Sequence, residues 1–401
     1  MIKIIDKSKC SGCSACAGIC PRNSISMKTD GEGFVYPNVN QDTCIDCGAC
    51  DKICPIINAV PENKTNQWGF IIQNKDLQVL RESTAGGFYT AIAEYVIEKN
   101  GIVYGAEISN TLEVHHISIE NKNDLWKFRN SKYVQSFIGG ELLKDVKRNV
   151  CSGRLVLFSG TPCQIEGLIK IVGNHKNLLT VDVVCRATPS PLMFRKYIEY
   201  QEKIQNSRIK QVIFRDKFYG YKYSTLNLTT ENNNGNYHCG VESDPWLRAF
   251  FSNKINRPAC YECHFRKQYR ISDFTIWDCF QVGRYSKKLD NDKGATRLLI
   301  HSEQGYHIFD QIKFKFNYIS VSPDKLVKTT KEMFCSIEKP NRTIRDKLFK
   351  DANQMNGYEF FEKYFPETIS VKIKRFIRIL SLKLGVYATL KKIYVKITKK
   401  Y

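Results

Sequence analysis

The chain has 401 residues, of which 42% are hydrophobic and 25% are charged, a length and composition that exclude a wholly disordered protein and leave room for two or three domains. Its formal net charge of +21 suits an acidic protein partner, an anionic membrane surface, a phosphate-bearing ligand or nucleic acid. Because no helix-turn-helix, zinc-finger or aromatic RNA-binding pattern is present, we expect no nucleic-acid partner.

Sixteen cysteines are present, and the first ten residues hold only a short apolar run that is broken by Lys3 and Asp6. Chains stapled by disulfides normally begin with a secretion signal, so we expect reduced thiols in the cytoplasm. No uninterrupted apolar run of about 18 residues occurs, and we therefore expect no transmembrane helix.

Two identical cysteine runs lie in the first 60 residues, each with the spacing C-x2-C-x2-C-x3-C-P and ending in Pro21 and Pro55. In bacterial ferredoxins, three cysteines of such a run bind one 4Fe-4S cluster and the fourth binds the other cluster. We therefore predict two clusters, one held by Cys10, Cys13, Cys16 and Cys54, the other by Cys44, Cys47, Cys50 and Cys20. Gly12 and Gly48 lie inside the loops, where backbone N–H groups must turn toward sulfur. A pair of zinc sites is the alternative.

The segment between the runs, Ile25 to Val39, predicts a short hairpin with turn residues Asp30-Gly31 and Gly33. The sequence predicts a linker at about Val60 to Gln67, so a second domain should begin near Trp68.

That second domain should open with a strand at Gly69 to Gln73 and a polar glycine turn at Arg81 to Gly87. A helix ending near Asn100-Gly101 and a strand at Ile102 to Ile108 follow. This order places free N–H groups of a helix N-terminus beside two glycines, which favours a phosphate site. A plainly capped helix is the alternative.

A similar unit starts with a strand at Arg154 to Phe158. Thr161 suits the cap and Pro162 the first position of the next helix, so Cys163 should lie in the first turn, where the helix dipole lowers a thiol pKa. A strand at Leu178 to Val184 ends in Cys185. Cysteines after two such strands are expected to face one crevice, as ligand sites in open α/β sheets do.

A further Cys-x2-Cys pair, Cys260 and Cys263, lies on a turn. We hypothesise that Cys163, Cys185, Cys260 and Cys263 hold a third 4Fe-4S cluster; structural zinc and a free or catalytic thiol are the alternatives. The remaining cysteines are taken as buried apolar thiols, with Cys279 beside Asp278 the one nearest to a cofactor role: Cys151, Cys239, Cys279 and Cys335. The seven histidines show no metal-ligand spacing.

The C-terminal residues predict a basic amphipathic helix from Ile369, with an apolar stripe of Ile369, Ile373, Phe376, Ile377, Leu380 and Leu384 among lysines and arginines. A second basic stretch continues through Leu390, Ile393 and Ile397. Such a helix can lie on an anionic membrane surface, cover the protein core or bind a partner.

Several motifs together resemble the beta-subunit family of coenzyme F420 hydrogenases and dehydrogenases, from the cysteine runs to about residue 340. They are, in chain order, Ser83-Thr84-Ala85-Gly86-Gly87-Phe88, Ser131-Lys132-Tyr133-Val134-Gln135-Ser136, Gly160-Thr161-Pro162-Cys163-Gln164, Thr188-Pro189-Ser190-Pro191 after Cys185, and Pro258-Ala259-Cys260-Tyr261-Glu262-Cys263 with Ser272-Asp273.

The resemblance implies a non-covalent FAD between two α/β parts, with the extra cluster near it. The residues implied to contact FAD are the glycine turn and a second segment: Ser83, Thr84, Gly86 and Gly87, and Ser131, Lys132, Tyr133 and Gln135. A helix N-terminus and a lysine can offset pyrophosphate charge, and an aromatic ring can lie along the flavin. FAD would couple one-electron traffic through clusters to two-electron chemistry on a substrate.

We therefore expect an α+β chain: a bacterial-type 2x(4Fe-4S) ferredoxin module (1–60), the two parts of an α/β flavin-binding body (68–150 and 151–340) and a basic helical tail (341–401). The resemblance implies a flavin-dependent oxidoreductase that takes electrons from a ferredoxin-like or other redox donor to a small organic substrate, in some relatives tied to cell-surface polysaccharide synthesis. The alternative is an electron-transfer subunit without its own substrate.

The catalytic residues are not identified. Asp273, Asp278 and Lys132 stand at motif positions and could donate protons, but a structural ion pair explains each of them equally well. We expect a cytoplasmic protein, with peripheral contact at the inner membrane face if the tail binds lipid.

Overall fold

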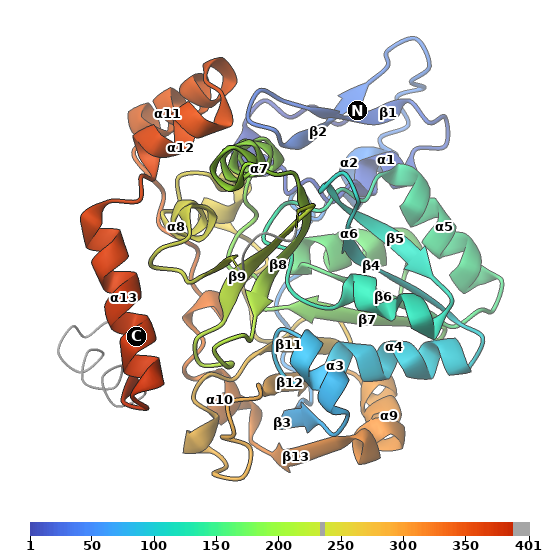
Figure 1. The fold of residues 1–401 in the computed structure, drawn as a ribbon. Coiled ribbons are helices and arrows are strands. Elements are labelled where there is room, and N and C mark those ends of the chain that lie inside the picture. The colour runs from blue at the N-terminus through green and yellow to red at the C-terminus, as the bar shows by residue number, and fades with distance from the viewer. Residues whose placement is uncertain (233–236, 388–401) are drawn as a thin grey trace.

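The computed structural model describes residues 1–232 and 237–387, and shows a mixed α+β protein. The N-terminal module lies at the top of Figure 1, above a body built on one large and one small sheet. No helix in the described part of the chain combines the length and the apolar character needed to cross a membrane.

The N-terminal module is a hairpin flanked by two one-turn helices. Its elements are η1 (Lys7–Lys9), α1 (Ala15–Ile19), β1 (Ile25–Thr29), β2 (Val35–Val39) and α2 (Ala49–Ile53). The carboxylate of Asp30 accepts the N–H groups of Glu32 (2.9 Å) and Phe34 (3.0 Å), and Gly33 has the positive φ of 83° that the turn requires. The predicted hairpin, antiparallel from Ile25 opposite Val39, is confirmed.

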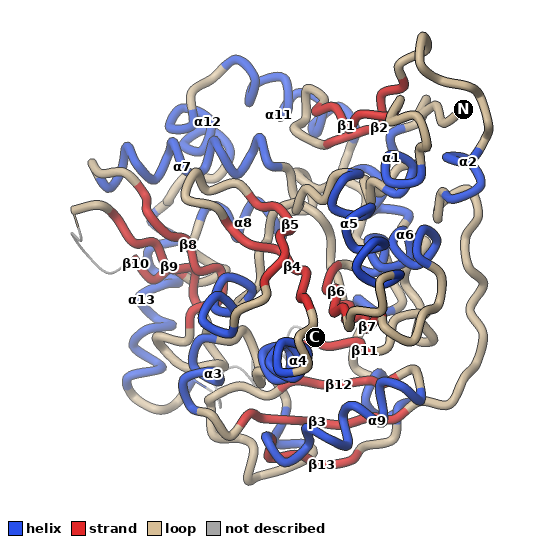
Figure 2. The backbone as a smooth tube through the Cα atoms, turned by 90° about the vertical axis from the view of Figure 1, so that its right-hand side faces the viewer, coloured by secondary structure: helices blue, strands red, loops and turns tan. Residues whose placement is uncertain are grey.

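The large sheet has eight strands in the order β13-β3-β12-β11-β7-β6-β4-β5, stacked from bottom to top in Figure 2. Four central strands, β11, β7, β6 and β4, are parallel, and the outer neighbours pair antiparallel. The strands come from both expected parts of the body: β3 (Trp68–Asn74), β4 (Ile102–Ile108), β5 (Val114–Ile119), β6 (Val156–Gly160), β7 (Leu178–Val183), β11 (Phe274–Asp278), β12 (Thr296–Ile300) and β13 (Phe316–Ser320).

Helices cover both faces of this sheet because neighbouring strand residues point to opposite sides. One core contains Leu157 of β6 together with apolar residues of α4 (Phe88–Glu98), η2 (Lys122–Phe128) and α9 (Glu303–Ile312). The other contains Val156 and Phe158 with residues of α5 (Gly140–Cys151) and α6 (Pro162–Val172). Cys13 and Ala15 belong to this second core, so the N-terminal module packs directly on the body.

The small antiparallel sheet consists of β10 (Tyr237–Cys239), β9 (Thr225–Thr230) and β8 (Ile209–Asp216). It shares an aromatic-rich core with four helices: α7 (Pro191–Gln205), α8 (Pro245–Phe251), α11 (Arg342–Gln354) and α12 (Gly357–Tyr364). Further helical elements are η3 (Pro258–Glu262), η4 (Val282–Arg284), η5 (Lys313–Lys315), α10 (Pro323–Val327), η6 (Lys331–Met333) and α13 (Ile369–Lys383).

The predicted strands at β3, β4, β6 and β7 are confirmed, as is the helix that follows the glycine turn. Sequence analysis missed the short helix α3 (Leu77–Glu82), whose N-terminus is capped by the carboxylate of Asp76 through the N–H groups of Gln78 and Val79. A helix of six residues is too short to show a periodic pattern.

Gly86, in the glycine turn, packs directly against the backbone of strands β3 and β12. A Cβ atom there would overlap the carbonyl oxygen of Ile72 and approach the amide nitrogen of Thr296 to 2.6 Å. We expect Gly86→Ala to lower the free energy of unfolding by about 1–3 kcal/mol, measured as a shift in the urea midpoint. Gly31→Ala is the control, because nothing lies within 4 Å of a Cβ atom at that position. Equal midpoints for the two variants would contradict this packing.

Candidate functional site

The two cysteine runs fold into loops of the same conformation. Positive φ angles occur at equivalent positions, at Gly12 (73°) and Ser14 (63°) in the first loop and at Asp46 (46°) and Gly48 (69°) in the second. Left-handed residues turn successive N–H groups toward one side of a loop. The N–H groups of Ser24 and Ile2 in fact point at sulfur, with donor to Sγ distances of 3.3 Å to Cys20 and 3.2 Å to Cys50.

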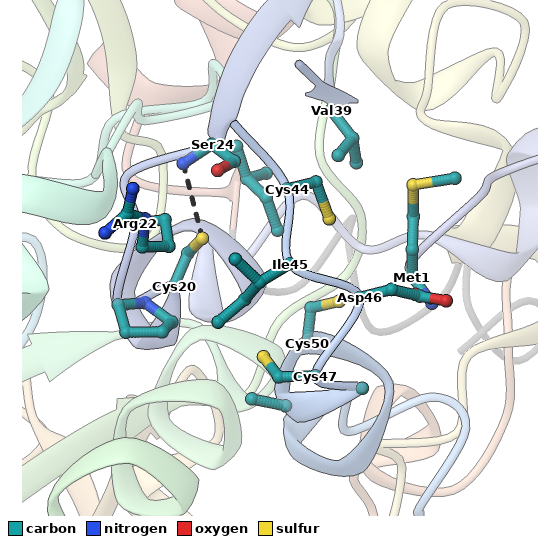
Figure 3. Close-up of a pocket in the computed structure, with 14 residues that line it drawn as sticks. Met1, Cys20, Arg22, Ser24, Val39, Cys44, Ile45, Asp46, Cys47 and Cys50 are labelled. Atoms are coloured by element: carbon teal, nitrogen blue, oxygen red, sulfur yellow. Dashed lines mark hydrogen bonds and ion pairs between the residues drawn. The ribbon is translucent and has the colours of Figure 1, made fainter. Parts of the chain in front are cut away.

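The structure brings the eight cysteines together in the crossed sets that the spacing predicts. One pocket is lined by Cys10, Cys13, Cys16 and Cys54. A second pocket, shown in Figure 3, is lined by Cys20, Cys44, Cys47 and Cys50. Four thiols around one pocket, with N–H donors beside the sulfurs, form the donor set that a 4Fe-4S cluster takes.

The four cysteines of the expected third set also lie together. Burial raises the pKa of the Cys163 thiol well above its usual range, and the nearby thiols of Cys263, Cys185 and Cys13 add to that rise. Burial likewise raises the pKa of Cys185 to about 12, with contributions from Cys260 and Cys263. The expected lowering of the Cys163 pKa is therefore wrong, because burial disfavours the charged thiolate. In the described ranges, no three His, Cys, Asp or Glu side chains converge so as to hold a single metal ion.

The other cysteines divide by burial. Cys239 and Cys279 are buried, as expected, but Cys151 and Cys335 are exposed, so the expectation of a buried thiol is wrong for these two. Cys279 packs among apolar side chains and does not line the large cavity described below, although its neighbours Asp278 and Phe280 do.

The first and third cysteine sets are neighbours. Helix α6, which carries Cys163 in its first turn, passes so close to the N-terminal module that a Cβ atom at Gly167 would lie 2.9 Å from the sulfur of Cys13. The cap of that helix is as predicted: Thr161 and Gln164 form a capping box, and Pro162 occupies the first position.

Arg257 joins the same region from the loop before Cys260. Its side chain is 1% exposed and donates to the Cys10 carbonyl oxygen (2.7 Å), the Val35 carbonyl oxygen (2.9 Å) and Gln135 Oε1 (3.1 Å). Its Nη2 also lies 3.5 Å from the Cys10 sulfur. Within residues 1–232 and 237–387 it forms no ion pair with a carboxylate, so its charge is left for another anion to balance.

A cavity of about 680 Å³ opens at the carboxyl ends of the four parallel strands. Ala106 of β4, Gly160 of β6, Val183 of β7 and Asp278 of β11 each contribute to its wall. The edge beyond the carboxyl ends of parallel strands is where open α/β sheets bind ligands, and this volume suits a cofactor. Cys163 and Cys185 line the same cavity, so the two cysteines do face one crevice.

Seven of the eight residues expected to contact a flavin line this cavity: Ser83, Thr84, Gly87, Ser131, Lys132, Tyr133 and Gln135. Gly86 does not. Its N–H donates to Thr296 Oγ1 (2.7 Å), and its missing side chain permits the close backbone approach described above. The cavity wall combines residues of both expected parts of the body.

The glycine turn is held in place from two sides. Thr84 Oγ1 accepts the N–H of Ser131 (2.8 Å) and lies 3.0 Å from the Ser131 hydroxyl, which ties the turn to the second segment that is expected to contact a flavin. Behind the turn, the Lys217 ammonium donates to the carbonyl oxygens of Leu80 (2.6 Å), Ala85 (2.8 Å) and Lys293 (2.8 Å).

The N-terminus of α4 faces the cavity directly after this turn. Gly87 at the cap position has a positive φ of 77° and provides no side-chain cap, while Phe88, Tyr89 and Thr90 line the cavity. First-turn N–H groups that no side chain caps are a suitable site for a phosphate.

Lys132, which is expected to offset pyrophosphate charge, is bound by backbone carbonyl groups of the protein. Its ammonium donates to the carbonyl oxygens of Lys127 (2.8 Å) and Arg129 (2.7 Å), and burial lowers its pKa to about 7. Lys132 is therefore held by carbonyl groups of the protein, and its lowered pKa leaves it only partly charged at neutral pH.

The two aspartates considered as proton donors are also engaged. Asp273 Oδ2 accepts from the N–H and hydroxyl of Thr180, and Asp273 does not line the cavity. Asp278 does line it, but its carboxylate pairs with Arg215 (3.1 Å) and accepts the Tyr221 hydroxyl (3.0 Å).

Sequence analysis missed many residues of the cavity wall, among them His116 and Arg215. The buried His116 imidazole stacks on Phe158, donates from Nε2 to the Ser159 carbonyl oxygen (2.9 Å), and accepts at Nδ1 from the Ser136 hydroxyl (2.7 Å). Burial lowers its pKa to about 4, so it is neutral at physiological pH. Neither residue lies next to a motif in the sequence. His116 on β5 and Arg215 on β8 reach the cavity only when the two sheets have folded.

Comparisons with known proteins agree with the motifs. Residues 153–324 match the family model for the C-terminal part of the beta subunit in coenzyme F420 hydrogenases and dehydrogenases, and residues 9–57 match the 4Fe-4S dicluster domain. The predicted resemblance is confirmed by these two matches. A chain of the F420-reducing [NiFe] hydrogenase complex from Methanosarcina barkeri, solved after xenon derivatization, matches with a TM-score of 0.43 and 16% identity, over 76% of this chain and 94% of that one. No curated protein matches the chain.

Proposed function

We propose that this chain is a flavin-dependent oxidoreductase. The premise is that it is an iron–sulfur electron-transfer protein related to the beta subunits of coenzyme F420 hydrogenases and dehydrogenases. In this proposal the crossed sets of N-terminal cysteines hold two 4Fe-4S clusters, Cys163, Cys185, Cys260 and Cys263 hold a third, and the large cavity holds FAD. A ferredoxin-like or other redox protein supplies electrons, and a small organic molecule receives them, in the setting of cell-surface polysaccharide synthesis that the resemblance implies.

One observation supports this proposal above the others: Cys163 lies at the junction of all three regions. It neighbours Cys13 of the first set, belongs to the third set, and lines the cavity that seven flavin candidates share. The first set, the expected third set and the cavity are therefore neighbours at Cys163, which supports an electron path through it.

The residues around the cavity fit FAD. The N-terminus of α4 after Gly87 would hold the pyrophosphate, and Thr84 and Ser131 would hold polar groups beside it. Bound FAD would supply the conversion between one-electron and two-electron transfer. The chain itself provides the neutral His116 and the Asp278–Arg215 pair as fixed polar groups in the wall.

The test of this proposal is the flavin content of the protein purified without oxygen. Denaturation should release about one FAD per chain, as a resident redox cofactor requires. Absence of flavin after reconstitution would contradict the oxidoreductase proposal and leave the second candidate function.

The second candidate is an electron-transfer subunit that has no substrate of its own. It is favoured by the observation that Lys132, Asp273 and Asp278 are all engaged in internal contacts, which leaves none of the three suggested proton donors free. The anaerobically reduced protein can distinguish the candidates when it is mixed with fractions of its own cell extract. Reoxidation by the small-molecule fraction supports the enzyme, whereas reoxidation by the protein fraction alone supports the electron-transfer role.

Arg257 should raise the reduction potential of the cluster bound by Cys10, because its buried charge stabilises the extra electron. One unit charge at several ångströms, in an effective dielectric of about 20, contributes a few kcal/mol. We expect Arg257→Gln to lower that potential by about 50 mV or more, measured by redox titration followed by EPR. Arg345→Gln is the control, since Arg345 is also buried but already pairs with Glu32 (2.5 Å). Equal potentials in wild type and Arg257→Gln would contradict this role.

A further inference from the structure

The helix α13 lies on the outer side of the molecule, along the edge of the body in Figure 1. Its large apolar side chains face outward rather than inward: Ile369 is 78% exposed, Phe376 66% and Ile377 56%, and Ile373 and Leu380 are also exposed. Only Val371 and Ser381 are buried in this helix. An ordinary surface helix buries its apolar stripe, so this arrangement is inverted.

Two arginines attach the helix to the body. Arg378 pairs with Glu242 and lies over the ring of Tyr223 at 5.3 Å, and Arg375 donates to the His238 carbonyl oxygen (3.4 Å). These contacts fix which side of the helix faces the protein. The apolar stripe of Ile369, Ile373, Phe376, Ile377 and Leu380, called the outer stripe below, is consequently left on the opposite side.

The charge around the outer stripe points to an anionic surface. Helix α13 contains five cationic residues and no acidic one: Lys372, Lys374, Arg375, Arg378 and Lys383. The three lysines are exposed beside the stripe. A helix with an apolar face and flanking lysines is the pattern of interfacial membrane helices, and each lysine near an anionic headgroup adds to binding.

Other occupants of the outer stripe fit less well. A second copy of the chain, itself at +21, would bring the same five cations against each other. The fifteen residues span about 22 Å, less than the ~30 Å of a bilayer core, so the helix would lie in the headgroup region rather than cross.

We propose that α13 binds the surface of an anionic lipid bilayer through its outer stripe, with the arginine side holding the body against the membrane. The helix attaches to the small sheet, whose strand β8 also carries the cavity residue Arg215. This inference does not depend on the flavin or on any cluster. The second basic stretch predicted from Leu390 to Ile397 lies outside the described residues, and the inference is built on α13 alone.

The test uses the full chain and vesicles of phosphatidylcholine with or without phosphatidylglycerol, separated by sedimentation. Wild-type protein should bind the anionic vesicles in a salt-sensitive manner and leave the neutral vesicles largely unbound. Phe376→Ser/Ile377→Ser should reduce binding at least tenfold, because both side chains lose their apolar area. Both residues are exposed, so the fold should be unaffected.

The control is Phe314→Ser, which removes a side chain of similar exposure (67%) outside α13. It should bind vesicles as wild type does. Failure of the wild type to bind anionic vesicles, or equal binding by the double variant, would overturn the proposal. Self-association in ultracentrifugation that the double variant abolishes, without vesicle binding, would also overturn it and assign the stripe to a second copy of the chain.

Discussion

Replacing Cys163 with alanine is expected to remove one cluster of three and to stop electron flow to the cavity. Cys163 neighbours Cys13 of the first set and itself lines the cavity. Iron content should fall from about twelve to about eight atoms per chain, since each cluster contains four. Flavin should remain bound, but its reduction through the N-terminal clusters should fall to near zero. Iron analysis and anaerobic absorbance measure both effects.

Cys151→Ala is the matched control, because it removes an exposed thiol that belongs to none of the three sets. It should keep the full iron content and the full rate of flavin reduction. A Cys163→Ala protein that retained about twelve iron atoms would contradict the assignment of the third set. A Cys163→Ala protein that lost about four iron atoms per chain but kept the full rate of flavin reduction would contradict an electron path through the third set.

Replacing Lys217 with methionine is expected to weaken FAD binding although Lys217 touches no ligand-facing surface. Its ammonium satisfies three carbonyl oxygens, those of Leu80, Ala85 and Lys293, and so fixes the glycine turn from behind. A buried carbonyl that loses its donor costs about 1–3 kcal/mol. The turn should loosen, and the dissociation constant for FAD should rise at least tenfold, which corresponds to about 1.4 kcal/mol. Titration of flavin-free protein, followed by fluorescence, measures this.

Lys210→Met serves as its control, since Lys210 lies exposed on β8, a few residues before Lys217. It should bind FAD as tightly as wild type. The positioning role would be contradicted if Lys217→Met bound FAD normally. It would also be contradicted if iron content fell together with flavin, because that would indicate a general loss of fold.

The cysteine chemistry was predictable because it depends on local spacing. The two identical runs define both loops, and their spacing predicted the crossed sets. In the structure each fourth cysteine ends a one-turn helix and does not start one, as Cys20 does after α1 and Cys54 after α2. The cap at Thr161 and Pro162 is equally local. In these segments, neighbours along the chain decide the structure.

The missed features depend on contacts between distant segments. Arg257 reaches Cys10 across 247 positions of sequence, and its burial without a carboxylate is visible only when both loops are folded. Gly86 belongs to a family motif, yet it contacts strands rather than the cavity. Periodicity predicted the stripe on α13, but the arginine contacts that turn the stripe outward involve the small sheet. A pattern gives the faces of a helix without saying which face is covered.

The measurement that tests the central claim most directly is rapid anaerobic mixing of the purified protein with a reduced ferredoxin. Absorbance of the iron–sulfur clusters and of the flavin would be followed separately in time. The account predicts that the clusters are reduced first, that the flavin follows, and that Cys163→Ala reduces only the clusters. Flavin reduction that precedes cluster reduction, or that proceeds unchanged in Cys163→Ala, would contradict an electron path from the N-terminal module through Cys163 to the cavity.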